Sequence, residues 1–309
     1  MGRLFHFSSI SQSTDQTRMN TLLPFAASDM PLAFRPPADP DDAYENRLHI
    51  PNADKHLSAW PVDAAAFRDR HPDSDYDRSY GTGERSAYDL FLPEGGIQAA
   101  TGVVAFVHGG YWVALSKSDV SHLASGLLAR GWAVAMIGYT LAPQARIADI
   151  TRKIANAVTA LGKVGTGPLR LAGHSAGGHL VTRVMCRDVD LGAAALDRLD
   201  RVVSISGLHD LRPLRTLAKN DLWRLDDDES AQESPALRSP RQNIDLVCVA
   251  GAEERPEFIR QNALLPLVWQ GLGVPGHGQL LAGHNHFTII ETMTDPRSRL
   301  CDLIAAPLG

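Results

Sequence analysis

LRLAGHSAGGHL (residues 169–180) begins like a buried strand and continues like a helix, with glycines crowded around one serine, Ser175. The segment from Gly173 to Gly177 has the pattern G-x-S-x-G, which is typical of a tight strand-to-helix turn that holds a serine hydroxyl out above a sheet. Side chains at the two outer glycines would collide with the neighbouring strand and helix. The stretch therefore predicts a nucleophile that is held above the sheet at the end of a parallel strand.

Several other segments have the hydrophobicity of strands that are covered on both faces. Their apolar runs are continuous rather than alternating, as expected in a parallel sheet, and they lie at residues 103–107, 132–139, 202–205 and 246–250. Between them, residues 119–130 are predicted to be helical with Gly131 as the C-cap, and apolar residues recur every three or four positions from Ile147 to Leu161. This rhythm predicts an α/β fold, a doubly wound and mostly parallel sheet with helices on both faces.

The chain of 309 residues is expected to form one domain with a tail. Residues 1–35 are predicted to be disordered and residues 36–309 to form the domain. Within the domain, residues 36–79 are rich in proline, aspartate and alanine. We call this segment the arm and expect it to pack on the core through short helices near Pro40–Asn46 and Ala64–Arg70.

Two further segments carry predictions of their own. SAYDLFLP (residues 86–93) alternates like a half-buried strand, with Tyr88, Leu90 and Leu92 on one face. Residues 207–243 are polar, include the run DDDE and interrupt the strand–helix rhythm. We interpret them either as a solvated insertion or as a lid over the carboxyl edge of the sheet.

Composition excludes several classes of protein. A formal charge of −5 with scattered Lys and Arg argues against a nucleic-acid partner, and no apolar run is long enough to span a membrane. Three cysteines without a C-x-x-C pair favour reduced thiols and a cytoplasmic location, and Cys248 lies in an apolar run and is expected in the core. The sequence does not indicate an oligomeric state.

HGGYW (residues 108–112) follows the buried run at 103–107 and is the second piece of a candidate site. Glycines let backbone N–H groups turn toward a ligand, so donors from Gly109, Gly110 or Tyr111, together with the Ala176 N–H, are predicted to form an oxyanion hole. Tyr111 and Trp112 are interpreted either as walls of a pocket for an aromatic ring or as packing aromatics.

A serine hydroxyl needs a base, and the base needs a carboxylate that orients it. Among the late histidines, His277, His284 and His286, we predict His286 as the base because it lies in a loop between a probable last strand and a helix. Glu253 and Glu254 follow the buried run at 246–250, and either can serve as the acid. Asp245 precedes that run and is therefore expected at the wrong edge of the sheet.

Taken together, HGGYW, GHSAGGHL, the loop EERPEF and the late HF resemble the α/β-hydrolase superfamily, and specifically its arylformamidase (kynurenine formamidase) branch. The resemblance covers roughly Asp42 to the C-terminus. It assigns the acid to Glu254 rather than Glu253, although members of the branch more often have Asp there. It implies hydrolysis of N-formyl-L-kynurenine to kynurenine and formate, a step of tryptophan breakdown, by a catalytic triad of Ser175, Glu254 and His286.

Three other functions are weighed against this one. A carboxylesterase or thioesterase would use the same triad on another small-molecule ester. A metal hydrolase would use His174 and His179 or the pair His284 and His286, but the H-x-G-T-H-x-D motif of metal-dependent formamidases is absent, so neither a metal nor another cofactor is expected. A hydrolase-fold binding protein that has lost catalysis would be expected to lack a triad member, and none is missing.

Overall fold

The computed structural model describes residues 37–308, so the predicted disordered tail lies outside the described residues. Its centre is an eight-stranded sheet with the order β1-β2-β4-β3-β5-β6-β7-β8. β1 and β2, and β2 and β4, are antiparallel, whereas all later neighbours are parallel. The predicted α/β fold with a mostly parallel sheet is confirmed.

The strands are β1 (Asp75–Ser79), β2 (Ala87–Phe91), β3 (Val103–Val107), β4 (Ala133–Ile137), β5 (Leu169–His174), β6 (Leu199–Ile205), β7 (Asp245–Gly251) and β8 (Gly276–Leu281). The helices are α1 (Pro40–Ala43), α2 (Ala53–Asp69), α3 (Ser125–Leu128), α4 (Ile147–Leu161), α5 (Ala176–Val184), α6 (Ala193–Leu196), α7 (Asn220–Trp223), α8 (Asp227–Gln232), α9 (Pro256–Gln270), α10 (Thr288–Glu291) and α11 (Arg299–Ala305). The 3₁₀ helices are η1 (Arg47–His49), η2 (Lys117–Ala124), η3 (Arg212–Thr216), η4 (Pro235–Leu237) and η5 (Thr292–Thr294).

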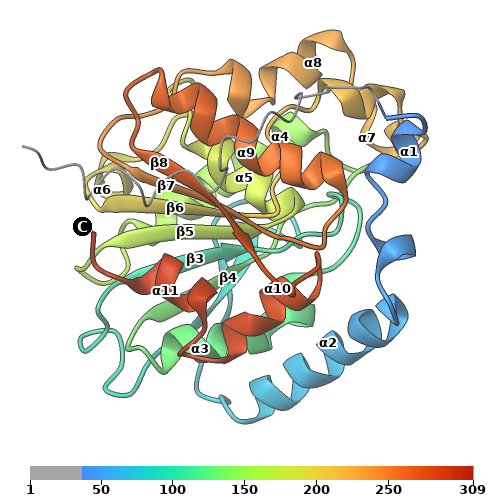
Figure 1. Ribbon diagram of the computed structural model, residues 1–309. Coiled ribbons are helices and arrows are strands. Elements are labelled where there is room, and N and C mark those ends of the chain that lie inside the picture. The colour runs from blue at the N-terminus through green and yellow to red at the C-terminus, as the bar shows by residue number, and fades with distance from the viewer. Residues whose placement is uncertain (1–36, 309) are drawn as a thin grey trace, which may run out of the picture. The chain divides into compact units, whose positions relative to one another are not determined.

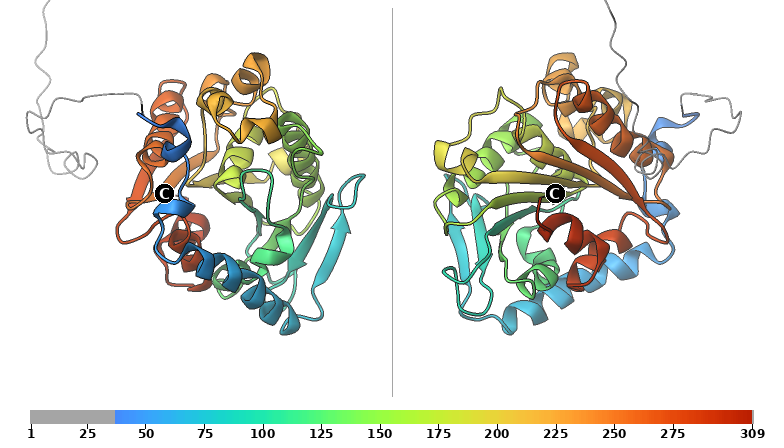
Figure 2. Two further views of the ribbon diagram at one scale, coloured as in Figure 1. Left: turned by 90° about the vertical axis from the view of Figure 1, so that its right-hand side faces the viewer. Right: turned by 60° about the vertical axis from the view of Figure 1, so that its left-hand side comes forward.

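Helices cover both faces of the sheet (Figure 1), as predicted. α4, α5 and α9 enclose one hydrophobic cluster, and α2, η2, α3, α10 and α11 enclose the other. Both views in Figure 2 show these two helical layers. Along β3, Val103, Ala105 and Val107 belong to the first cluster and Val104 and Phe106 to the second. The continuous apolar run of this strand therefore serves both cores, since successive side chains point to opposite faces.

The prediction that residues 86–93 form a half-buried strand is wrong, because all five residues of β2 are buried. The strand lies between β1 and β4 in the sheet, and Asp89 within it is fully enclosed. Its carboxylate accepts hydrogen bonds at 2.5 Å from Arg68 Nη1 and from Lys117 Nζ. A buried carboxylate needs such partners, and one of them comes from the arm.

The arm differs from its prediction in two ways. Its main helix, α2, runs from Ala53 to Asp69 and is much longer than the expected helix at Ala64–Arg70. The helix contains Pro61, and its sequence is largely polar, so its full length could not be predicted from an apolar pattern. Trp60 and Phe67 are buried on the face that packs against the core. The arm also ends in an edge strand, β1, that the sequence analysis did not predict.

The structure also shows what forms at residues 119–130 and at residues 207–243. The helix expected at residues 119–130 is instead a 3₁₀ helix, η2, followed by the short α3, because Val120 has non-helical backbone angles. Gly131 closes it with a φ of 78°, as predicted for a C-cap. Residues 207–243 contain η3, α7, α8 and η4, and they bury Trp223. Among residues 37–308, the helices are too short or too polar to cross a bilayer.

Candidate active site

The candidate residues follow the carboxyl ends of neighbouring parallel strands. HGGYW follows β3, Ser175 follows β5, Glu254 follows β7 and His286 follows β8. Because parallel strands end at one edge of the sheet, residues far apart in the chain meet there. The topology therefore brings the predicted nucleophile, acid and base to a common edge.

Ser175 occupies the predicted turn between β5 and α5. Its backbone has φ 55° and ψ −115°, a strained conformation for a residue with a side chain. A Cβ on Gly173 would come within 2.3 Å of the Gly177 oxygen, and one on Gly177 within 2.0 Å of the Val107 oxygen. Only glycine fits at either position, so the steric reason for the G-x-S-x-G pattern is present.

His286 lies in the loop between β8 and α10 and is buried. Its Nδ1 donates to Glu254 Oε2 at 2.7 Å. Asn285 holds the loop, because its side-chain oxygen accepts from the backbone N–H groups of Phe287 and Thr288. With Nδ1 committed to the carboxylate, Nε2 is the nitrogen left to accept a proton.

Glu254, and not Glu253, contacts the imidazole. Glu254 is buried and its second oxygen, Oε1, accepts from Ser206 Oγ at 2.5 Å and from the Gly251 N–H at 2.8 Å. Glu253 is exposed, and its backbone N–H binds the His284 oxygen. The two carboxylates differ because the chain turns directly after β7 and presents only the second one inward.

Sequence reasoning missed two residues at this edge. Ser206, directly after β6, binds Glu254 and has a φ of 53°, but a lone serine after a strand carries no recognisable signal. His174 is buried beside the base: its Nε2 donates to the His286 oxygen at 2.9 Å and the two rings lie 4.5 Å apart. Burial first, and then repulsion from His286, hold the pKa of His174 well below its usual value, so it is neutral.

The other histidines weighed as metal ligands do not lie together. His179 Nε2 donates to the Glu233 oxygen at 2.7 Å, and His284 is partly exposed with a backbone contact to Glu253. Within residues 37–308, no group of three His, Cys, Asp or Glu side chains is arranged to hold a metal ion.

The predicted oxyanion donors lie next to Ser175. A Cβ on Gly109 would lie 3.1 Å from the Ser175 Cβ. Gly110 has a φ of 102° and Tyr111 a φ of 50°, so the backbone turns sharply here. Over the described part of the chain, the N–H groups of Gly109, Gly110, Tyr111 and Ala176 donate to no protein acceptor. Unpaired N–H groups at a helix start and a glycine turn can bind a developing negative charge.

A cavity of about 410 Å³ opens over these residues. Ser175, His286 and His174 line one part of this cavity. Among residues 37–308, the Ser175 hydroxyl makes no hydrogen bond to His286, whose Nδ1 is bonded to Glu254. The rest of the cavity wall is largely apolar or aromatic, and three charged side chains also contribute to it. It consists of Leu57, Trp60, Gly110, Tyr111, Val113, Ala114, Leu115, Phe287, Asn46 and the charged residues Glu45, Arg47 and Lys219. The size is within the range of small-molecule sites.

Of the two aromatic residues proposed for the pocket, only Tyr111 lines it. Its hydroxyl donates to the Tyr44 oxygen, and burial raises its pKa. For Trp112 the structure favours the packing alternative over the pocket wall, because this side chain is fully buried, does not line the cavity and packs edge-on against His179 and Trp223. The left-handed backbone at residues 111 and 112 turns neighbouring side chains in different directions.

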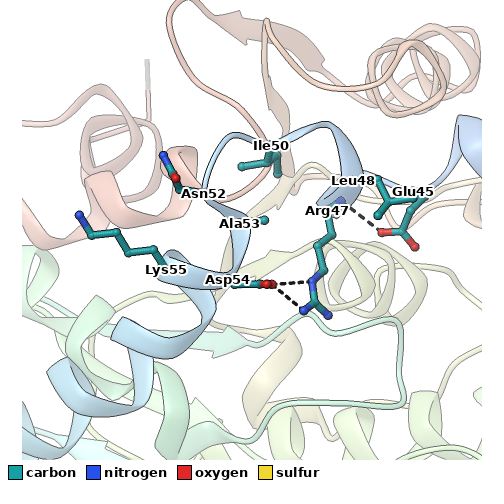
Figure 3. Close-up of a pocket in the computed structure, with 8 residues that line it drawn as sticks. All are labelled: Glu45, Arg47, Leu48, Ile50, Asn52, Ala53, Asp54 and Lys55. Carbon is teal, nitrogen blue, oxygen red and sulfur yellow. Dashed lines mark hydrogen bonds and ion pairs between the residues drawn. The ribbon is translucent and has the colours of Figure 1, made fainter.

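A second hollow, of about 720 Å³, lies on the arm (Figure 3). It shares Glu45 and Arg47 with the cavity at Ser175 but contains no candidate nucleophile. Figure 3 shows the Arg47 guanidinium directed at Asp54, and both side chains are largely exposed. This hollow is an outer surface of the arm beside the cavity.

The sheet order, the strained serine turn and the glycine loop together define an α/β hydrolase. Comparison with known proteins agrees, because residues 104–252 match the model of a family described as having the alpha/beta hydrolase fold. A crystal structure named for a proposed thioesterase from Silicibacter sp. is 42% identical, with a TM-score of 0.80 over 86% of this chain and 98% of that one. Esterase B from Lactobacillus rhamnosis, at 17% identity and a TM-score of 0.61, covers 80% of this chain and 89% of its own and shares the fold.

Two curated relatives have the same name, kynurenine formamidase. Kynurenine formamidase of Danio rerio is 26% identical over 242 residues, which are 75% of this chain and 81% of that protein. The Drosophila melanogaster kynurenine formamidase is 28% identical over 226 residues, 69% of this chain and 74% of its own. The chain belongs to the α/β-hydrolase superfamily, and over most of its length it is similar to kynurenine formamidases.

Proposed function

We propose that the protein is a serine hydrolase that cleaves a formamide or ester bond through an acyl-enzyme, with N-formyl-L-kynurenine as its substrate. The observation that carries the proposal is the hydrogen bond of 2.7 Å from His286 Nδ1 to Glu254 Oε2, in a cavity that also contains Ser175. The similarity to kynurenine formamidases supports the choice of substrate. That reaction would place the enzyme in tryptophan breakdown.

In the proposed mechanism, Ser175 Oγ attacks the carbonyl carbon while its proton passes to His286 Nε2. Glu254 holds the ring in the tautomer that leaves Nε2 free and stabilises the imidazolium. The N–H groups near Gly110 and Ala176 bind the oxyanion. The C–N or C–O bond then breaks, and the departing amine or alcohol takes the proton from His286.

The second half of the cycle repeats these steps with water. Water gives a proton to His286 Nε2 and attacks the acyl-enzyme, and the released Ser175 oxygen regains the proton. With a formamide substrate the products are an amine and formate. The mechanism needs no group beyond side chains and backbone N–H donors of this chain.

A carboxylesterase or thioesterase is the second candidate. The solved structure at 42% identity carries a thioesterase name, and the triad proposed here serves amides, esters and thioesters alike. Rates on N-formyl-L-kynurenine, p-nitrophenyl acetate and an acyl thioester separate these candidates. The preferred substrate is the one with the highest kcat/KM.

The Ser175→Ala variant tests the mechanism. We expect a folded protein whose kcat falls about 10⁶-fold, since triad members act as a unit, and which no longer reacts with a fluorophosphonate probe. Circular dichroism checks the fold, and Ser58→Ala, on the exposed side of α2, is the matched control. Wild-type turnover in Ser175→Ala would refute the proposed nucleophile.

A further inference from the structure

Two cavities of similar size share one lining residue, Trp60 of α2. The first is the cavity of about 410 Å³ at Ser175. The second, of about 420 Å³, is lined by Asn52, Lys55, His56, Ala59, Trp60, Asp63, His122, Glu291 and Thr294. Among these described residues, Trp60 is the one that lines both cavities. The indole is therefore the wall between them.

The indole is held on both sides. Its Nε1 donates to Glu291 Oε1 at 2.9 Å, and the same oxygen binds His56 Nδ1 at 2.7 Å. Its ring packs edge-on against Phe287, with centroids 5.2 Å apart. Only 2% of Trp60 is exposed. A side chain fixed in this way is a rigid boundary rather than a movable one.

The boundary lies close to the proposed chemistry. Phe287 directly follows His286, and both line the cavity at Ser175. The residues that α2 contributes to this cavity are Leu57 and Trp60, and together with Phe287 they form an apolar and aromatic part of its wall. A substrate group that extends from the reacting carbonyl toward α2 therefore meets the indole, and beyond the indole lies a space of similar size with polar walls.

Building on the proposed function, we propose that Trp60 is a specificity-determining residue that limits the length of the substrate group which the cavity at Ser175 accepts. The residue touches substrate without taking part in proton transfer. It comes from the arm, outside the residues 104–252 that match the family model. Residues at the edge of the sheet are thus proposed to carry out the reaction, and Trp60 of α2 is proposed to limit the length of the substrate group.

The test compares Trp60→Ala with the wild-type enzyme on two series of substrates. One series is p-nitrophenyl esters from acetate to octanoate, and the other is acetate esters of phenol, naphthol and larger aryl alcohols. Active sites are counted with a fluorophosphonate probe, so that a smaller folded fraction does not alter the result. We expect the ratio of kcat/KM for the longer to the shorter substrates to rise at least about tenfold in one series.

Trp60→Phe is the graded control, because it keeps an aromatic ring against Phe287 but loses the five-membered ring of the indole together with its Nε1–H. Its length profile is expected to lie between those of the wild type and Trp60→Ala. If Trp60→Ala does not fold, Trp60→Leu carries the same test, since it also removes the bicyclic ring.

Three outcomes distinguish the ideas. A ratio that rises in either series for Trp60→Ala, and rises less for Trp60→Phe, supports the size limit. Unchanged profiles in both series, in a folded and active variant, overturn it and leave the proposed function intact. If the wild-type enzyme neither turns over any of these esters or N-formyl-L-kynurenine nor reacts with the probe, the proposed function fails, and the size limit with it.

Discussion

The serine turn between β5 and α5 and the arm that carries α2 both border the same cavity, but they are built in different ways. At the turn, backbone atoms lie so close that a Cβ at Gly177 would come within 2.0 Å of the Val107 oxygen. The arm is attached through side chains instead: Trp60 donates a hydrogen bond to Glu291, and Arg68 donates one to Asp89. The turn allows one local sequence pattern, whereas many sequences can make the contacts of the arm.

This difference suggests a division of roles. The residues that we propose for the chemistry lie on the sheet edge, and the residue that we propose for substrate size lies on the arm. The predictions that follow test the division by changing one region and measuring whether the property assigned to the other stays the same.

After Ser175→Ala, the largest effect is expected from Glu254→Gln. A glutamine favours the wrong tautomer of His286 and cannot stabilise an imidazolium, so kcat should fall about 10⁴-fold, as in other triads. Steady-state kinetics measure the loss. Glu253→Gln is the matched control, since its exposed side chain should leave kcat unchanged. Equal losses in the two variants would contradict the assignment of the acid.

A smaller effect, on stability, is expected from Asp89→Ala at the attachment of the arm. The substitution removes the buried partner of Lys117, whose side chain is only 10% exposed, and leaves this lysine paired with the exposed carboxylate of Asp77 alone. Breaking a buried ion pair from one side costs about 3–5 kcal/mol, which urea unfolding measures. The folded fraction should keep its turnover of a short ester.

Asp54→Ala is the control for this substitution. Asp54 pairs with Arg47, and the two side chains are 81% and 57% exposed. Such a surface pair contributes at most about 1 kcal/mol. If the two substitutions destabilise the protein equally, the buried pair does not anchor the arm as we infer.

The smallest effect is on the pH dependence of stability. Burial lowers the pKa of His179 to about 3 and that of His209 to about 4, from an ordinary value of 6.5. Below about pH 6.5 the unfolded chain binds protons at these residues and the folded chain does not, so stability falls as the pH falls. Each histidine contributes at most about 1.4 kcal/mol per pH unit.

Unfolding free energies between pH 7 and pH 5 check this prediction. His179→Gln, whose amide can still donate to the Glu233 oxygen, should flatten the slope of stability against pH. His277→Gln, at an exposed position of β8, is the control and should leave the slope unchanged. A slope that His179→Gln does not alter would show that the acid sensitivity arises elsewhere.

The sequence predicted the sheet edge well for a physical reason. Continuous apolar runs mark strands that are buried on both faces, and five such runs match β3 to β7. The glycines around Ser175 are required by close backbone contacts at the turn, so a short sequence pattern is enough to predict the turn. His286, the proposed base, was predicted from the order of the chain, because it follows the last strand.

The arm was predicted poorly for the opposite reason. The sequence of α2 has little apolar periodicity and contains Pro61, so its inner face is not visible until Trp60 and Phe67 meet their partners. β2 looked half exposed because Asp89 interrupts its apolar residues. The carboxylate is buried only because Arg68 and Lys117, 21 and 28 residues away, reach it.

By itself, the sequence determined the α/β sheet, the serine turn and the identity of the residues that gather at its carboxyl edge, because each depends on backbone sterics and on hydrophobic patterns within short segments. The tertiary structure decided that Trp112 lies in the core and that Trp60 lines two cavities, and it shows that Glu254, which the family resemblance favoured over Glu253, contacts His286. These contacts depend on the direction in which a side chain leaves the backbone and on which residue lies opposite it, and the partners are between 32 and 231 residues away in the chain.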